Sequence, residues 1–220
     1  MKRIPEPAEL MDDPAQARAY AEADFEAPHA AFIDELTRLY PDEQPEHILE
    51  PGCGSGDISW RLAGYYPDTR IDAIDGAPPM LEIANELFHN KGCAEQVQTL
   101  QHTLPCDELP ITHYDAVITN AVLHHLLDPA VLWQTIKRAA KPGALVFVMD
   151  LARPASKQAA ADIVAREAAD EPEVLRTDFY HSLLAAYTPG EIREQLANAG
   201  LEHLSVTIPS ANHLLVHGRL

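Results

Sequence analysis

Segments with the pattern of strands alternate with segments with the pattern of helices along the centre of this chain. Five segments predict strands, at 47–49, 70–74, 97–100, 114–119 and 144–149. Helices are predicted between them, at 57–65, 78–91 and 129–140. The fifth strand is a continuous apolar run, which is expected of a strand covered on both faces. This alternation predicts an α/β fold built on a doubly wound, mostly parallel sheet.

Further helical patterns lie outside this alternation. Apolar residues recur near helical spacing over 13–40 and predict two helices, with Pro28 interrupting the run. After the fifth strand, residues 155–169 predict one helix, and another is predicted to begin near Asp178. These extra residues are interpreted as a lid over a ligand site.

The last part of the chain predicts a helix followed by a hairpin. Thr188 and Glu191 match a capping box, so a helix is predicted to run to Ala199 and to stop at Gly200. Residues 204–208 and 213–218 then have the pattern of two strands joined by a short turn.

A glycine-rich turn follows the first predicted strand. Glycines at 52, 54 and 56 tolerate positive φ and let the backbone approach a bound small molecule closely. Nineteen residues beyond Gly56, the second strand ends in Asp75, where an acid can accept hydrogen bonds from a ribose hydroxyl pair. Together these features indicate a nucleoside-bearing cofactor. A dinucleotide fingerprint would require glycine or alanine at position 57, and the chain has Asp57.

On these residues the chain resembles the class I S-adenosylmethionine-dependent methyltransferases. Their first motif is an acid, any residue, and three glycines alternating with any residue, and Glu50 to Gly56 match it position for position. The predicted C-terminal hairpin is similar to the antiparallel end of the methyltransferase sheet. The resemblance implies a seven-stranded, mostly parallel Rossmann-like sheet and S-adenosyl-L-methionine as the cofactor.

The resemblance also implies which residues bind this cofactor. Glu50 is expected near the amino acid part and Asp75 at the ribose hydroxyls. The other residues expected to contact the cofactor are Gly52, Cys53, Gly54, Gly56, Gly76, Met80, His102, Thr103, Asn120, Ala121, Val122 and His125. Members of the family commonly have an acid after the third strand, where this chain has Gln101-His102-Thr103. His102 and Asp107 are the alternatives for that contact with the adenine.

Candidate residues for the methyl acceptor are fewer. His124 is the leading candidate for a general base, because an ordinary imidazole titrates near neutral pH. The segments expected to cover the acceptor contribute Tyr20, Phe25, Arg153 and Tyr180, with Arg153 expected to hold a carboxylate of the acceptor. No metal is predicted from the possible ligands His102, Cys106 and His113, because their spacing does not give two close pairs.

Composition narrows the class of acceptor. The formal net charge of −18 repels phosphate backbones and anionic membranes, so a small-molecule acceptor is favoured over nucleic acid or lipid. Three scattered cysteines without a close pair favour a reducing compartment, and the N-terminus does not have the pattern of a leader or anchor. A cytoplasmic location is expected, and the sequence leaves monomer and homodimer open.

Residues 1–220 are interpreted as one domain. It is divided into an N-terminal helical cap (1–45), a cofactor-binding half (46–150), a helical lid insertion (151–188) and a C-terminal helix and hairpin (189–220). The predicted function is S-adenosylmethionine-dependent methylation of an oxygen, nitrogen or sulfur atom of a small molecule, with carbon acceptors left open. The alternatives are a non-catalytic or regulatory protein that binds the same cofactor and an NAD-dependent oxidoreductase.

Overall fold

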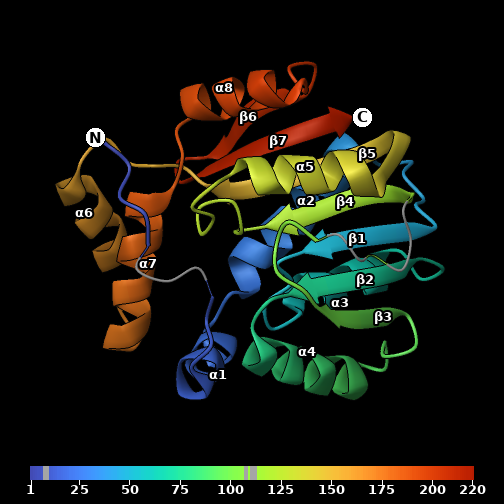
Figure 1. Cartoon of the computed structure of the whole chain (residues 1–220). Coiled ribbons are helices and arrows are strands. Elements are labelled where there is room, and N and C mark those ends of the chain that lie inside the picture. The colour runs from blue at the N-terminus through green and yellow to red at the C-terminus, as the bar shows by residue number, and fades with distance from the viewer. Residues whose placement is uncertain (7–9, 107–108, 110–112) are drawn as a thin grey trace.

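A single seven-stranded sheet forms the centre of the molecule (Figure 1). The computed structural model describes residues 1–6, 10–106, 109 and 113–220. The strands are β1 (His47–Pro51), β2 (Arg70–Asp75), β3 (Val97–Gln101), β4 (Tyr114–Asn120), β5 (Ala140–Leu151), β6 (Ser205–Ser210) and β7 (His213–Arg219). Their order is β3-β2-β1-β4-β5-β7-β6, in which β1 to β5 pair in parallel and β7 and β6 are antiparallel. The predicted fold class and the C-terminal hairpin are therefore confirmed.

Helices cover both faces of the sheet. They are α1 (Pro14–Glu22), α2 (Glu26–Leu39), α3 (Asp57–Tyr65), α4 (Pro78–Lys91), α5 (Ala130–Ala139), α6 (Lys157–Glu167), α7 (Glu173–Ala185) and α8 (Pro189–Ala199). One core cluster joins α2, α3 and α4 to one face of the sheet, and a second joins α5 and α8 to the other face. Apolar residues of both faces alternate along β4 and β5, which explains why these strands are apolar throughout.

Two predicted helix boundaries are wrong. Pro28 lies in the first turn of α2 and does not interrupt it, because the first amides of a helix need no intrahelical acceptor. The chain instead leaves the helical conformation at Ala23, whose backbone is extended. The helix predicted to begin near Asp178 begins at Glu173, directly after Pro172.

The start of the fifth strand also differs from the prediction. Residues 141–143 were expected to separate a helix from a strand, but β5 begins at Ala140, as soon as α5 ends. A register shift in the pairing of β4 with β5 absorbs these residues, and Gly143 has a φ of +82°. The capping box at Thr188 and the stop at Gly200 are confirmed.

The carboxyl ends of the parallel strands face α1 and α7 (Figure 1). Residues 1–6, which we call the N-terminal strap, run along α7. The N–H of Ile4 donates to the carbonyl of Leu184 at 3.0 Å, and the terminal amino group donates to the carbonyl of Ala155 at 3.1 Å. The strap and α7 thus close over the sheet edge at which ligands bind in open α/β folds. No helix in the described part of the chain is long and apolar enough to cross a membrane.

Candidate active site

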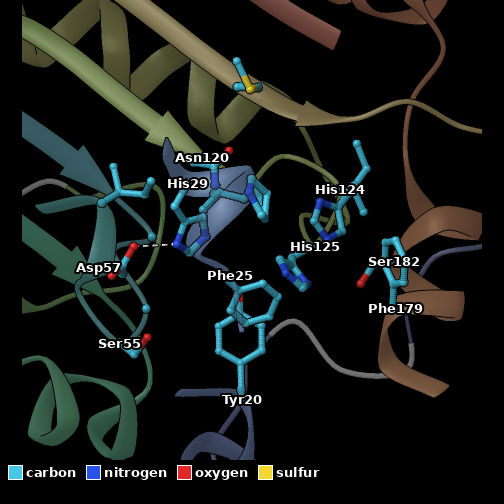
Figure 2. A pocket seen from close by; sticks show the side chains of 18 of the residues that line it. Tyr20, Phe25, His29, Ser55, Asp57, Asn120, His124, His125, Phe179 and Ser182 are labelled. Carbon is cyan, nitrogen blue, oxygen red and sulfur yellow. Dashed lines mark hydrogen bonds and ion pairs between the residues drawn. The ribbon is translucent and has the colours of Figure 1, made fainter. Parts of the chain in front are cut away.

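A cavity of about 1330 Å³ lies at the carboxyl ends of the parallel strands. Its walls come from the glycine turn, the ends of β2 and β4, the first two helices and α7 (Figure 2). All the predicted cofactor residues line it except Gly56, the last glycine of the turn and the N-cap of α3. His124, Tyr20 and Phe25 line it as well. The structure therefore brings together residues that the sequence holds more than a hundred positions apart.

Two glycines of the turn are closely packed, and the glycine between them is open. A Cβ atom at Gly52 would lie 2.0 Å from Cγ2 of Val122, and one at Gly56 would lie 2.6 Å from Cζ of Phe88. Both glycines also have positive φ, at +68° and +87°. A Cβ atom at Gly54 would meet no atom within 4 Å. The backbone at Gly54 is thus open to the cavity, which is the cradle that a closely bound cofactor requires.

Asp75 is connected directly to this turn. One carboxylate oxygen accepts a hydrogen bond from the N–H of Gly54 at 2.9 Å, and the other accepts one from the N–H of Ala77 at 2.8 Å. Burial raises the pKa of Asp75, and these backbone donors oppose that shift. The carboxylate faces the cavity with lone pairs left for further donors, as a ribose hydroxyl pair would provide.

Glu50 lines the cavity from the end of β1. It is buried, and the hydroxyl of Ser59 donates to its carboxylate. Burial raises the pKa of Glu50 to about 8, against the opposing effect of Ser59. The side chain is therefore neutral at pH 7 without a ligand, and a bound cation would favour its ionised form.

The residues expected at the adenine lie beside the ends of β2 and β3. The N–H of His102 donates to the carbonyl of Asp75 at 3.1 Å, so the residue after β3 is held beside the end of β2. A Cβ atom at Gly76 would lie 2.8 Å from Cδ2 of Leu10 and 3.0 Å from Cγ2 of Thr103, so these two side chains pack closely around this glycine. Asp107, the other alternative for the adenine contact, lies outside the described residues.

The loop after β4 carries a strained residue and two histidines. Ala121 has a φ of +55°, which is unusual for a residue other than glycine, and its N–H donates to the carbonyl of Met149 at 2.9 Å. This turn directs the loop toward the cavity. His124 follows, buried to within 2% of its surface, with Nδ1 2.6 Å from the carboxylate of Asp150. The remaining nitrogen, Nε2, faces the carboxylate of Glu6 at 4.0 Å.

Asp150 affects both the pKa of His124 and which of its ring nitrogens is free. Burial alone would lower the pKa of His124, but the charges of Asp150 and Glu6 outweigh it, so the pKa is raised. The pKa of Asp150 is lowered in turn, because its pairing with His124 outweighs the effect of burial. With Nδ1 hydrogen-bonded to a carboxylate, Nε2 is the nitrogen that can act on a ligand.

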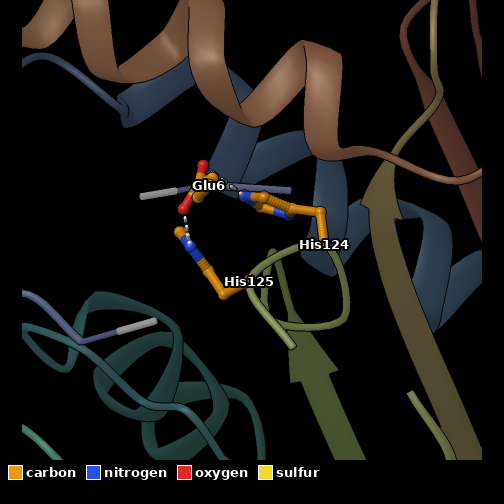
Figure 3. A group of neighbouring side chains, drawn as sticks. All are labelled: Glu6, His124 and His125. Atoms are coloured by element: carbon orange, nitrogen blue, oxygen red, sulfur yellow. Dashed lines mark hydrogen bonds and ion pairs between the residues drawn. The ribbon is translucent and has the colours of Figure 1, made fainter. Parts of the chain in front are cut away.

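His125 lies beside His124, with ring centroids 4.0 Å apart. Its Nδ1 is 2.5 Å from Glu6 (Figure 3). The hydroxyl of Ser182 donates to the same carboxylate at 2.6 Å. The possible ligand atoms of Glu6, His124 and His125 all lie within 4.8 Å of one another. The side of the cavity opposite the glycine turn is thus rich in groups that can bind or activate an acceptor.

Comparison with known proteins decides the family. A family model described as a methyltransferase domain matches residues 20–206. The chain belongs to that family. It is a class I S-adenosylmethionine-dependent methyltransferase, and S-adenosyl-L-methionine is its cofactor. This assignment excludes the alternative of an NAD-dependent oxidoreductase.

Similar methyltransferases share most of the chain's length. An uncharacterized methyltransferase of Mycobacterium bovis is 25% identical over 174 residues, which cover 79% of this chain and 83% of that protein. The malonyl-acyl-carrier-protein O-methyltransferase of Dechloromonas aromatica is 28% identical over 176 residues, 78% of this chain and 57% of that enzyme.

Solved methyltransferase structures share the fold. An S-adenosylmethionine-dependent methyltransferase from Aquifex aeolicus has a TM-score of 0.70 at 18% identity, covering 94% of this chain and 98% of that one. A plantazolicin methyltransferase in complex with a substrate analogue and SAH has a TM-score of 0.68 at 13% identity, covering 94% and 89%.

Two of the residues predicted to contact the acceptor do not reach the methyltransferase cavity. The side chain of Arg153 is only 5% exposed, and its guanidinium donates to the carboxylate of Glu191 at 2.7 Å. Tyr180 lies on α7 between residues that line the cavity, but its own side chain does not, because neighbours on a helix point in different directions. Phe179 and Ser182 reach the cavity from the same helix (Figure 2).

Tyr20 and Phe25 stand together at the cavity wall. Their ring centroids are 4.8 Å apart, and the ring of His29 stacks on Phe25 at 5.3 Å. His29 is fixed in turn by Asp57, whose carboxylate is 2.6 Å from Nδ1 (Figure 2). The first two helices therefore supply the methyltransferase with an aromatic wall that is joined to the start of α3.

Sequence reasoning missed several residues of this site. Asp150 is the penultimate residue of β5 and lies beside the histidine loop. Its place directly after the predicted strand 144–149 was the signal that could have found it. Glu6 and Ser182 had no comparable signal, because each reaches the site through a long-range contact of a segment without a motif.

Proposed function

We propose that this methyltransferase methylates an oxygen, nitrogen or sulfur atom of a small molecule held between the glycine turn and the histidine loop. The observation that carries the proposal is that one cavity has a cofactor cradle at Gly54 and Asp75 on one side and the Asp150–His124 pair on another. When bound, S-adenosyl-L-methionine supplies a methyl group activated by its sulfonium, and attack by an acceptor lone pair on that methyl group would release S-adenosylhomocysteine.

The residues on the cofactor side have distinct tasks in this proposal. The open backbone at Gly54 contacts the cofactor, and Asp75 accepts hydrogen bonds from the ribose hydroxyls. Glu50 faces the amino acid part, where a positive charge would draw it into its ionised form. His102, Thr103, Gly76 and Met80 form the adenine wall, and Met80 provides a soft apolar surface for the ring.

His124 is the proposed activating residue on the acceptor side. Asp150 fixes its ring through Nδ1, so the Nε2 lone pair is available to the acceptor whenever that nitrogen is unprotonated. Holding the acceptor close to the methyl group accounts for much of the acceleration, since the sulfonium is already activated. Tyr20 and Phe25 would position the acceptor by packing against it.

The walls favour an acceptor of limited size. The first two helices, α7 and the N-terminal strap surround the cavity, whose volume of about 1330 Å³ holds the cofactor and a compact second molecule. The similar enzymes named above act on malonyl-acyl-carrier protein and on plantazolicin, and they do not choose the acceptor atom for this chain.

A labelled-methyl experiment tests the proposal. The protein is incubated with methyl-labelled cofactor and a small-molecule extract, and mass spectrometry follows S-adenosylhomocysteine and labelled products. We expect both to form, and His124→Asn to slow their formation by about 10²-fold or more, the typical contribution of a positioned acid or base. His89→Ala, an exposed histidine on α4, is the matched control and should have no effect.

Two outcomes would contradict parts of this proposal. If the protein binds the cofactor in calorimetry but forms neither product in any extract, the non-catalytic alternative replaces the proposal. If His124→Asn reacts as fast as wild type, the acceptor is activated elsewhere in the cavity.

A further inference from the structure

Three side chains with metal-ligating atoms converge at the acceptor side of the cavity. Glu6 comes from the N-terminal strap, and His124 and His125 come from the loop after β4 (Figure 3). Their ligand atoms all lie within 4.8 Å of one another, and all three residues line the cavity. Two imidazoles and one carboxylate with an open side are a ligand set that suits a divalent transition metal.

The ligands are oriented by partners outside the cluster. Asp150 holds Nδ1 of His124 at 2.6 Å and also accepts from its backbone N–H at 3.2 Å. Ser182 donates to the carboxylate of Glu6 at 2.6 Å. A carboxylate behind a ligating histidine is a common outer shell of metal sites, because it fixes the ring and makes the free nitrogen a better ligand.

The distances within the cluster are close to those between ligands of a single ion, and small side-chain movements would match them. Atoms that bind one zinc ion at about 2.0–2.1 Å lie roughly 3–4 Å apart. Nε2 of His124 lies 4.0 Å from one oxygen of Glu6, a separation too long for a hydrogen bond. Nδ1 of His125 lies 2.5 Å from the other oxygen and shares a hydrogen with it. An ion would replace that shared hydrogen and would also engage His124.

We infer that Glu6, His124 and His125 bind a divalent transition-metal ion whose remaining positions open toward the methyl acceptor. Binding of the ion needs only the geometry of the cluster. Its use in catalysis rests on the proposed function. With Nε2 of His124 bound to it, the ion would take over the activating role of that nitrogen: it would bind the acceptor heteroatom and lower the pKa of its proton, which would pass to solvent as the methyl group is transferred.

A second group of ligand-type residues provides an internal comparison. Glu46, His47 and Asp115 also approach within 4.8 Å, but away from the cavity. The ammonium group of Lys141 pairs with Asp115, and the N–H of His47 donates to the same carboxylate at 2.9 Å. Because the ammonium group of Lys141 already neutralises Asp115, we do not expect this second group to bind a metal ion. His47→Ala is therefore the matched control.

Metal binding can be measured without knowledge of the acceptor. The full chain is stripped with a chelator and titrated with Zn²⁺ by calorimetry and with Co²⁺ by visible absorption. We expect one equivalent of either ion to bind, with absorption typical of nitrogen and oxygen ligands for Co²⁺. Ser182→Ala should weaken binding by roughly 10–100-fold, the usual effect of removing an outer-shell partner, and His125→Ala should weaken it further. His47→Ala should bind like wild type.

Two binding results would overturn the inference. Absence of binding at micromolar Zn²⁺ in the folded, cofactor-binding protein would show that the cluster is only a hydrogen-bonded contact. Equal binding by wild type, His125→Ala and Glu6→Gln would place the ion elsewhere. Cofactor binding by the metal-free protein is measured in parallel, so a failed metal site is distinguished from a failed methyltransferase assignment. If chelation leaves methyl transfer unchanged, the ion has no part in catalysis and His124 acts alone.

Discussion

At the scale of single residues, Asp75 joins the cofactor cradle to the sheet. Its carboxylate orders the glycine turn through Gly54 and is expected to accept the ribose hydroxyls. We expect Asp75→Ala to weaken S-adenosylmethionine binding by about 1.5–3 kcal/mol, the usual loss for hydrogen bonds to a charged group. Calorimetric titration measures this change. Asp68→Ala, which removes an exposed acid of the turn before β2, should bind normally, and unchanged affinity in Asp75→Ala would place the ribose elsewhere.

The raised pKa of Glu50 predicts that the affinity for the cofactor depends on pH. Its pKa is raised from 4.5 to about 8, so the free protein holds a proton there across this interval. A cation bound nearby favours the carboxylate, so cofactor binding releases a proton below pH 8. Affinity should therefore rise with pH between these values and level off above about 8.

The measurement for Glu50 is calorimetry in buffers of different ionisation enthalpy, which reports the protons released. Glu50→Gln keeps the shape of the side chain but cannot ionise, so the release should disappear and the affinity should become flat in this interval. A similar proton release in wild type and Glu50→Gln would assign the titration to another group.

At the scale of elements, the turn between β1 and α3 depends on glycine at two close contacts. In Gly56→Ala, the new methyl group would lie 2.6 Å from Phe88 and the residue would keep a φ of +87°. Left-handed backbone costs roughly 1–2 kcal/mol, and overpacking adds about 1–3 kcal/mol. Unfolding by denaturant should therefore show a loss of about 2–5 kcal/mol.

Gly64 is the matched control for Gly56. It lies in α3, and a Cβ atom there meets nothing within 4 Å. Gly64→Ala should stabilise the protein by up to about 0.5–1 kcal/mol, because alanine has a higher helix propensity than glycine. Equal stability of the two variants would mean that the turn relaxes more freely than its contacts indicate.

Elements with local signals could be predicted from the sequence. The turn from β1 into α3 and the capping box of α8 combine a motif with clear apolar spacing, and both were predicted correctly. Element boundaries that depend on tertiary contacts were not predicted correctly. The early start of β5 depends on its pairing with β4. The helix α7 begins at Glu173, directly after Pro172, and not near Asp178 as predicted.

The residues of the candidate site also divide into those with a local signal in the sequence and those without one. The residues expected at the cofactor come from strand ends, which a parallel sheet brings to one edge whatever the details of packing. The acceptor side depends on segments without motifs. Nothing local in the sequence places Glu6 beside His125, or turns Arg153 toward Glu191 and away from the cavity.

At the scale of the whole molecule, the N-terminal strap connects parts that are distant in sequence. The guanidinium of Arg3 donates to the carbonyls of Ala185 at 2.5 Å, His124 at 2.8 Å and Leu126 at 3.0 Å. It also lies 4.3 Å from the ring centroid of Tyr187. The strap thus ties the end of α7 to the histidine loop and brings Glu6 to the cavity, so the acceptor side is assembled by the first residues of the chain.

Arg3→Ala tests this assembly. Removing hydrogen bonds from a partly buried charged group should destabilise the protein by about 1.5–3 kcal/mol, and the loss should be local to the strap and its partners. Hydrogen exchange measured by mass spectrometry should therefore speed up in the histidine loop and at the end of α7, while β1 and β4 stay protected. The same variant should bind Zn²⁺ more weakly, because Glu6 loses its anchor. Lys2→Ala, an exposed neighbour, is the control. Unchanged exchange in both segments would mean that the loop holds its shape without the strap, and Glu6 would then be a passive contact.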